Sequence, residues 1–202
     1  MNFFQKILIK IAGLFFPCKI YGKENLPSGK AVLVCNHFSF VDPLFFKVIT
    51  KEESFVLAKK ELFENKFFSK FLKGFGGIPV DRDNPGISTI VQVTRALKDD
   101  KKVFIFPEGS RNRVGKGEPM QLKGGCAIFA IKSKAPIVPM AMVKKAKLFT
   151  RTKILIGKPF YLEEYYDIKP TPEQIDNIGM DLRNKMIEIQ NQLIEITKKK
   201  KK

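Results

Sequence analysis

Histidine and cysteine are scarce in this 202-residue sequence, and tryptophan is absent. One histidine, His37, and three cysteines, Cys18, Cys35 and Cys126, are too few for a zinc cluster, and three cysteines cannot all pair as disulfides. Acidic residues are also few: 20 Asp and Glu stand against 37 Lys and Arg, for a formal net charge of +17. We therefore expect no bound metal, the reduced thiols of a cytosolic environment, and a polyanionic partner: nucleic acid, an anionic membrane surface or a phosphorylated substrate.

Long apolar runs are absent as well. The segment 1–16 spaces seven Phe, Ile and Leu residues at the helical period and places Lys6 and Lys10 on the opposite side. It is shorter than the roughly 20 apolar residues of a membrane-spanning helix, and it lacks the charge-first order and the small-residue cleavage site of a signal peptide. We expect residues 1–17 to form an amphipathic helix in the plane of an anionic membrane surface; a first helix packed on the core is the alternative.

Strand and helix patterns alternate across residues 31–157 without a linker or an internal repeat. We therefore expect one α/β domain over residues 18–197, with a largely parallel or mixed sheet flanked by helices. The sequence Thr171-Pro172-Glu173-Gln174 has the pattern of a capping box, which predicts the start of a long C-terminal helix packed on the sheet. The lysines at 198–202 are expected to form a disordered basic tail.

Two other segments have helical periodicity. Residues 60–75 mix lysines with phenylalanines, which is typical either of a helix that contacts a bilayer or an acyl chain, or of an ordinary amphipathic helix. Asn84-Pro85 is typical of a helix start, and this helix should run to about Lys98. Its expected inward face is Ile87, Ile90, Val91, Thr94 and Leu97.

The segment 31–42 carries the clearest chemistry. An apolar run that ends at Cys35 predicts a buried strand, and Asp42-Pro43 predicts a helix start, so His37 lies between the two. Open α/β sheets place their chemistry outside the carboxyl ends of strands. A His37–Asp42 pair suits removal of a proton from a substrate hydroxyl, because a carboxylate fixes the imidazole tautomer and stabilises the imidazolium. A structural histidine is the alternative. Strand alternation should point Cys35 into the core, which leaves no obvious protein nucleophile.

Four sequence blocks resemble, in order, those of the glycerophospholipid acyltransferase family, which includes 1-acylglycerol-3-phosphate acyltransferases. NHFSFVD at 36–42 resembles the NHxxxxD motif, and GGIPVDR at 76–82 resembles the second block. FPEGSRN at 106–112 resembles the third block, with Ser110 in place of threonine, and APIVPM at 135–140 resembles the fourth. The resemblance implies acyl transfer with no cofactor, the acyl thioester being a co-substrate.

The third block is where the resemblance places the glycerol phosphate. Gly109 allows close backbone approach, and Arg111 offers a planar fork that matches phosphate, so Arg111 is the expected main contact. Glu108 could orient Arg111 or the hydroxyl acceptor. Arg82 and Lys123 could also bind the phosphate. The alternatives are a structural ion pair for Arg82 and a solvated side chain for Lys123. The candidate substrate- and phosphate-binding residues are Glu108, Gly109, Ser110, Arg111, Arg82 and Lys123.

By this resemblance the protein transfers an acyl group from acyl-CoA or an acyl carrier protein to the sn-2 hydroxyl of lysophosphatidate, making phosphatidic acid. Glycerol 3-phosphate or another lysophospholipid is an alternative acceptor. The expected location is the cytoplasmic face of the cell membrane, with the protein peripheral or monotopic. A non-catalytic basic protein that binds membranes or nucleic acid would explain the charge but leaves His37 and Asp42 unused. No nucleic-acid-binding motif is present, so we expect no nucleic acid partner.

Overall fold

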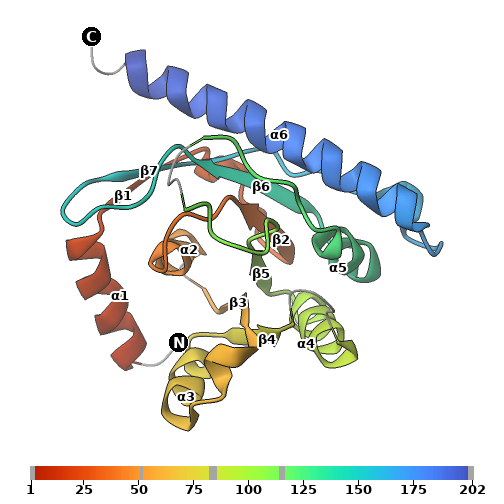
Figure 1. The fold of residues 1–202 in the computed structure, drawn as a ribbon, viewed down its shortest axis with the longest axis horizontal. Helices are drawn as coiled ribbons and strands as arrows, with labels where there is room; N and C mark the ends of the chain where they lie inside the picture. The colour runs from red at the N-terminus through yellow and green to blue at the C-terminus, as the bar shows by residue number, and fades with distance from the viewer. Residues whose placement is uncertain (1–2, 51, 82–85, 114–116, 200–202) are drawn as a thin grey trace.

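Seven strands form one mixed sheet in a computed structural model that describes residues 3–50, 52–81, 86–113 and 117–199 (Figure 1). The strand order is β1-β7-β6-β2-β5-β3-β4, and every neighbouring pair is parallel except β6 and β7. The expectation of a single α/β sheet, parallel or mixed, is confirmed. The strands are β1 (Cys18–Tyr21), β2 (Ala31–Cys35), β3 (Ser54–Lys59), β4 (Gly77–Val80), β5 (Lys102–Ile105), β6 (Ile137–Met142) and β7 (Thr152–Ile156).

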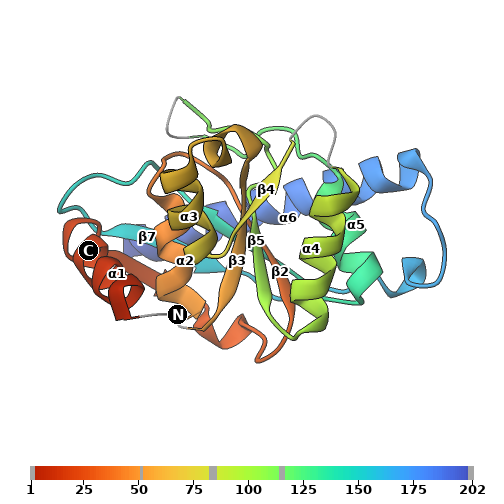
Figure 2. The ribbon, with the colours of Figure 1, turned by 90° about the horizontal axis from the view of Figure 1, so that it is seen from below.

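Helices cover both faces of the sheet. Figure 2 shows α4 and α5 on one side of the strands, with α2 and α3 on the other. The long helix α6 packs across β6 and β7. The helices are α1 (Phe3–Phe15), α2 (Asp42–Thr50), α3 (Lys66–Gly74), α4 (Ile87–Lys98), α5 (Gly125–Ser133) and α6 (Pro172–Lys199). Short 3₁₀ helices are η1 (Lys23–Asn25), η2 (Lys60–Phe63) and η3 (Glu163–Tyr165).

The central strand β2 is buried along its whole length, which explains its unbroken apolar sequence. Val32 and Val34 pack into the core beneath α4, α5 and α6. Leu33 and Cys35 pack on the opposite face with the phenylalanines of α2. The alternation along β2 therefore sends Cys35 into the core, as predicted.

The predicted helix over 60–75 is wrong in its extent. Residues 60–63 form a 3₁₀ turn, and α3 begins only at Lys66. Asn65 explains the break, because its side chain accepts a hydrogen bond from the backbone N–H of Phe68 at 3.0 Å and so acts as the N-cap of α3.

The predicted inward face of α4 is also wrong in part. Ile87 is 81% exposed and Val91 is 58% exposed. The buried residues are Thr89, Val93, Ala96 and Leu97. Both sets have helical spacing, so periodicity alone could not choose between them, and the true face is set by packing on β5 and α5. The predicted helix start at Asn84-Pro85 lies outside the described residues.

The C-terminal helix forms as predicted. The N–H of Thr171 donates to Oε1 of Gln174 at 2.8 Å, and the N–H of Gln174 donates to Oγ1 of Thr171 at 3.2 Å, which is a capping box. Its buried stripe is Ile178, Leu182, Met186, Ile189 and Leu193. The helix continues to Lys199, so the first two lysines of the predicted tail are helical and the last three lie outside the described residues. Within the described part of the chain, no helix is both long and apolar enough to cross a membrane.

Candidate active site

The third-block residues and His37 meet at the carboxyl edge of the sheet. Strands β2 and β5 are parallel neighbours, with Val34 opposite Ile105, so the residues that follow them leave the sheet side by side. His37 follows β2, Glu108 follows β5, and Asp42 opens α2. The sheet topology therefore brings the first and third sequence blocks together, as the sequence predicted.

His37 and Asp42 form a hydrogen-bonded pair. Nδ1 of His37 lies 2.9 Å from Oδ2 of Asp42, and Asp42 is fully buried. The same oxygen accepts the backbone N–H groups of Phe38 and Ser39, each at 2.7 Å. Because an ionised carboxylate can only accept, Nδ1 carries the proton of the neutral imidazole and Nε2 is left as an acceptor. This is the geometry of a general base with an orienting carboxylate.

The backbone of His37 is fixed from two sides by the loop after β5. Its N–H donates to Oε1 of Glu108 at 3.2 Å, and its carbonyl accepts the N–H of Asn112 at 2.7 Å. The imidazole also stacks on the ring of Phe106, with ring centroids 3.9 Å apart. His37 is only 6% exposed, so its ring is held in one position with little surface open to solvent.

Glu108 joins the two loops through His37 rather than through Arg111. Burial raises the pKa of the Glu108 carboxyl to about 7, against the opposing effect of the backbone N–H groups of His37 and Met120. The nearby Asp42 carboxylate adds to the rise. A pKa of about 7 puts the titration of Glu108 near neutral pH, directly beside the His37–Asp42 pair.

The other candidate binding residues gather around the turn at Gly109. Gly109 has φ +66°, which favours glycine, and an added Cβ would lie 3.1 Å from the Lys123 side chain. The guanidinium of Arg111 lies 3.5 Å from the ring centre of Phe40, an exposed aromatic in the loop after His37. Ser110 is exposed in the same turn. Arg82 lies outside the described residues.

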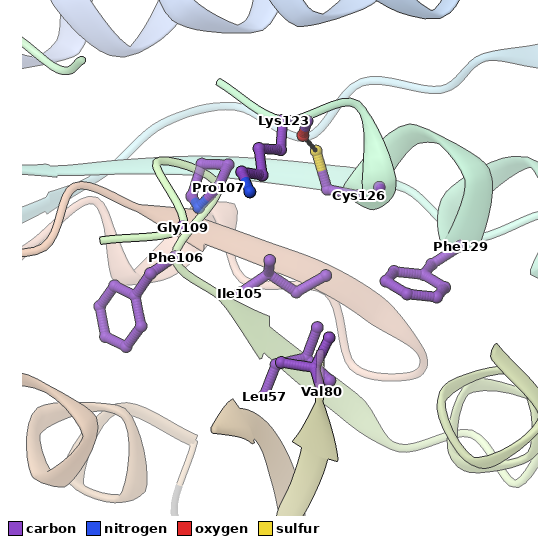
Figure 3. Close-up of a pocket in the computed structure, with 10 residues that line it drawn as sticks. Leu57, Val80, Ile105, Phe106, Pro107, Gly109, Lys123, Cys126 and Phe129 are labelled. Atoms are coloured by element: carbon purple, nitrogen blue, oxygen red, sulfur yellow. Dashed lines mark hydrogen bonds between the residues drawn. The ribbon is translucent and has the colours of Figure 1, made fainter. Parts of the chain in front are cut away.

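A mainly apolar cavity of about 70 Å³ opens beside this turn (Figure 3). Lys123 and Cys126 border it on one side, and Leu57 and Val80 border it on the other. Phe106, which stacks on His37, is also part of the lining. The cavity therefore combines an apolar surface with a cationic side chain, and it reaches His37 only through Phe106.

Two of the three cysteines are buried in the core and poorly suited to act as nucleophiles. Burial raises the pKa of Cys35 well above its ordinary value and raises the pKa of Cys126 to about 12, so both remain protonated thiols. All three cysteines are free. Within the described residues, no group of three or more His, Cys, Asp and Glu side chains could hold a metal ion.

Three site residues were missed by sequence reasoning. Asn36 accepts the N–H of Met142 and donates to its carbonyl, both at 2.8 Å, and so ties the end of β6 to the residue before His37. Gln190 of α6 donates to the same carbonyl at 2.9 Å. The sequence shows Phe106 as an aromatic residue at the end of a strand, but it does not show that Phe106 stacks on His37. Asn36 was signalled only as a polar residue at a strand end.

The comparisons with known proteins agree with this arrangement. A family model described as Acyltransferase matches residues 17–143. The 1-acyl-sn-glycerol-3-phosphate acyltransferase of Bacillus subtilis is 34% identical over 95% of this chain and 96% of its own length. That of Streptococcus pneumoniae is 36% identical over 54% of this chain and 40% of its own length.

A solved structure shows the same fold. The crystal structure of the 1-acyl-sn-glycerophosphate (LPA) acyltransferase PlsC from Thermotoga maritima matches with a TM-score of 0.66 at 19% identity, covering 96% of this chain and 79% of that one. The family match and the nearly full-length Bacillus relative confirm the family that the four blocks predicted: the chain belongs to the acyltransferase family.

Proposed function

We propose that this protein transfers a fatty acyl group from an acyl thioester to the free sn-2 hydroxyl of 1-acylglycerol 3-phosphate, making phosphatidic acid. The observation that carries the proposal is the buried His37–Asp42 pair, set beside a cationic turn. The activity named for the Bacillus subtilis relative, which aligns along nearly the whole chain, supports this choice of acceptor.

The reaction needs one base and no protein nucleophile. Nε2 of His37 takes the proton of the acceptor hydroxyl while the hydroxyl oxygen attacks the thioester carbon. Asp42 stabilises the imidazolium through Nδ1. The tetrahedral intermediate then collapses, the carbon–sulfur bond breaks, and the thiolate takes the proton back from the imidazolium. Because the thiol of the donor has a pKa near 8.5, its thiolate is a good leaving group and needs no metal ion to stabilise it.

The acceptor phosphate is held at the turn after β5. Arg111 supplies the bidentate cation, and stacking on Phe40 fixes the plane of its guanidinium. Lys123 adds a second positive charge beside Gly109, whose missing Cβ lets the backbone approach the phosphate. Ser110 supplies a hydroxyl in the same turn, and Arg82, outside the described residues, stays a candidate from the sequence alone. Glu108 acts by positioning the His37 backbone.

The substrates are amphiphiles, so the protein must reach a lipid surface. On α1, Leu14 is 72% exposed, and Ile7, Ile11 and Phe15 are between 39% and 47% exposed. These exposed apolar residues and the net charge of +17 support an in-plane contact of α1 with an anionic membrane. We place the protein as a peripheral or monotopic enzyme at the cytoplasmic face, with acyl-CoA or an acyl carrier protein as donor.

The decisive experiment is a thiol-release assay with detergent-dispersed lysophosphatidate and palmitoyl-CoA, run beside a His37→Ala variant. We expect acceptor-dependent thiol release that the variant loses by at least about 1000-fold, because its base is gone. The same assay with palmitoyl-acyl carrier protein identifies the donor. Activity in the variant close to that of the wild type would reject the mechanism, and silence with both donors would reject the function.

A further inference from the structure

The loop between β6 and β7 carries an aromatic side chain into solvent next to α1. Leu148 is 57% exposed and Phe149 is 71% exposed. The N–H of Phe149 donates to the carbonyl of Phe15 at 2.7 Å, and the two rings lie 5.5 Å apart. Together with Leu14 on α1, these residues form one exposed apolar ridge, built from two segments more than a hundred residues apart in sequence.

The backbone at Phe149, whose ring is exposed, has a strained conformation. Its φ is +56°, in the left-handed region that favours glycine or asparagine and is disfavoured for a bulky residue. The turn is closed by the N–H of Thr150, which donates to the carbonyl of Lys147 at 3.1 Å. A strained backbone that presents an exposed phenylalanine indicates that the ring has a function in contact with something else.

A cationic groove lies behind this ridge, between the same loop and the last turns of α6. Its volume is about 430 Å³. All the charged residues that line it are basic: Lys144, Lys145, Lys147, Arg151, Lys153 and Lys198. Such a groove attracts phosphate groups, and its charge adds to the positive charge of the whole chain.

We propose that the ridge and the groove form one docking surface for an anionic lipid bilayer, with the β6–β7 loop as a membrane anchor next to α1. Apolar side chains at the acyl boundary with basic side chains at the phosphate level are the arrangement that binds such a bilayer. An acidic carrier protein would match the groove but not the exposed ridge. The inference rests on the proposed function, because a bilayer is where the acceptor would be found.

The surface is also joined to the catalytic edge. The loop starts directly after Met142, whose backbone is bound by the side chain of Asn36, the residue before His37. A loop bound to lipid is therefore connected, through Met142 and Asn36, to the residue before His37.

The first test is a Phe149→Asn variant of the full chain. Asparagine tolerates positive φ, so the turn should survive and the thermal unfolding temperature should not fall. Binding to sedimented vesicles of equal phosphatidylglycerol and phosphatidylcholine should weaken by about 10-fold, because an inserted phenylalanine is lost. Equal binding by a folded variant would overturn the role of the ridge.

The second test removes charge from the groove. The triple variant Lys145→Gln, Lys147→Gln, Arg151→Gln should bind the same vesicles about 100-fold more weakly and pure phosphatidylcholine vesicles about as well as the wild type. The control triple variant Lys132→Gln, Lys158→Gln, Lys169→Gln loses the same charge from exposed positions in α5, after β7 and before α6. An equal loss in the control would show that net charge alone is responsible, and would overturn the groove.

Activity in detergent separates this surface from the proposed function. Both loop variants should release thiol at the wild-type rate from detergent-dispersed substrate, and lose activity only on vesicles. A raised KM for the acyl donor in detergent, with vesicle binding unchanged, would assign the groove to the donor and overturn the membrane anchor. If the wild type binds vesicles but releases no thiol with either donor, the proposed function fails while the docking surface stands.

Discussion

An Asp42→Asn substitution removes the negative charge next to His37 while keeping an oxygen in place. Oδ2 of Asp42 accepts the N–H groups of Phe38 and Ser39, both at 2.7 Å, as well as Nδ1 of His37. Two fixed backbone donors require an acceptor at that position, so the amide oxygen of asparagine should occupy it. The imidazole then keeps its tautomer, and the loss of activity reports the loss of charge alone.

The size of this loss can be worked from the geometry. At the 2.9 Å separation of the pair, opposite unit charges attract by about 6 kcal/mol at an effective dielectric constant of roughly 20, which is an upper bound. Net contributions of charged hydrogen bonds are about 1.5–3 kcal/mol. We expect a loss between the net range and the upper bound, about 3–4 kcal/mol of transition-state stabilisation, which corresponds to about 10²- to 10³-fold in kcat.

The assay is steady-state thiol release at saturating acceptor, with thermal unfolding as the structural control. The amide nitrogen of the variant would take the place of Oδ1, which has no hydrogen-bond partner among the described residues, so stability should fall by about 1–3 kcal/mol. An Asp42→Ala variant should be less stable still, because Phe38 and Ser39 lose their acceptor. A kcat within threefold of the wild type in the folded Asn variant would refute the role of the charge.

Three further predictions test the substrate site, the buried acid and α1. Arg111→Ala should raise KM for the phosphorylated acceptor by about 10- to 100-fold with kcat nearly unchanged, and an unchanged KM would move the phosphate site elsewhere. Because the pKa of Glu108 is raised to about 7, its folded state loses stability as pH rises from about 4.5 to 7, by up to about 3 kcal/mol before solvent screening and about half that after it. Glu108→Gln should therefore melt higher than the wild type at pH 8 but not at pH 4, and equal melting temperatures at pH 8 would contradict the raised pKa. Deleting residues 1–16 should weaken vesicle binding, whereas undiminished, salt-resistant binding by the truncated protein would transfer that role to residues 60–75 or to the β6–β7 loop.

The parts of the site that sequence predicted are those encoded within one short segment. The five-residue offset between His37 and Asp42 works because the intervening turn is local, closed by backbone N–H groups that point at one carboxylate. The strand-then-polar pattern at residues 31–37 and 103–111 also placed both blocks at a carboxyl edge, since parallel strands share that edge.

The parts that sequence could not predict depend on residues that only the fold brings together. Asn36 and Met142 are 106 positions apart, and no local pattern shows that the side chain of one would bind the backbone of the other. The inward face of α4 failed for a related reason. Its β-branched residues satisfy helical spacing on more than one side, and the choice between sides is made by packing against distant elements.

The carbonyl of Met142 makes the edge of the sheet beside His37 depend on the C-terminal helix. It accepts hydrogen bonds from both Asn36 and Gln190, so one atom is shared between the residue that follows β2 and the last helix. A chain that stops before residue 190 contains His37 and Asp42 but not the second donor, and it also loses the buried face of α6 that covers β6. Truncation within α6 should therefore loosen the edge of the sheet beside His37 even though His37 and Asp42 are both retained.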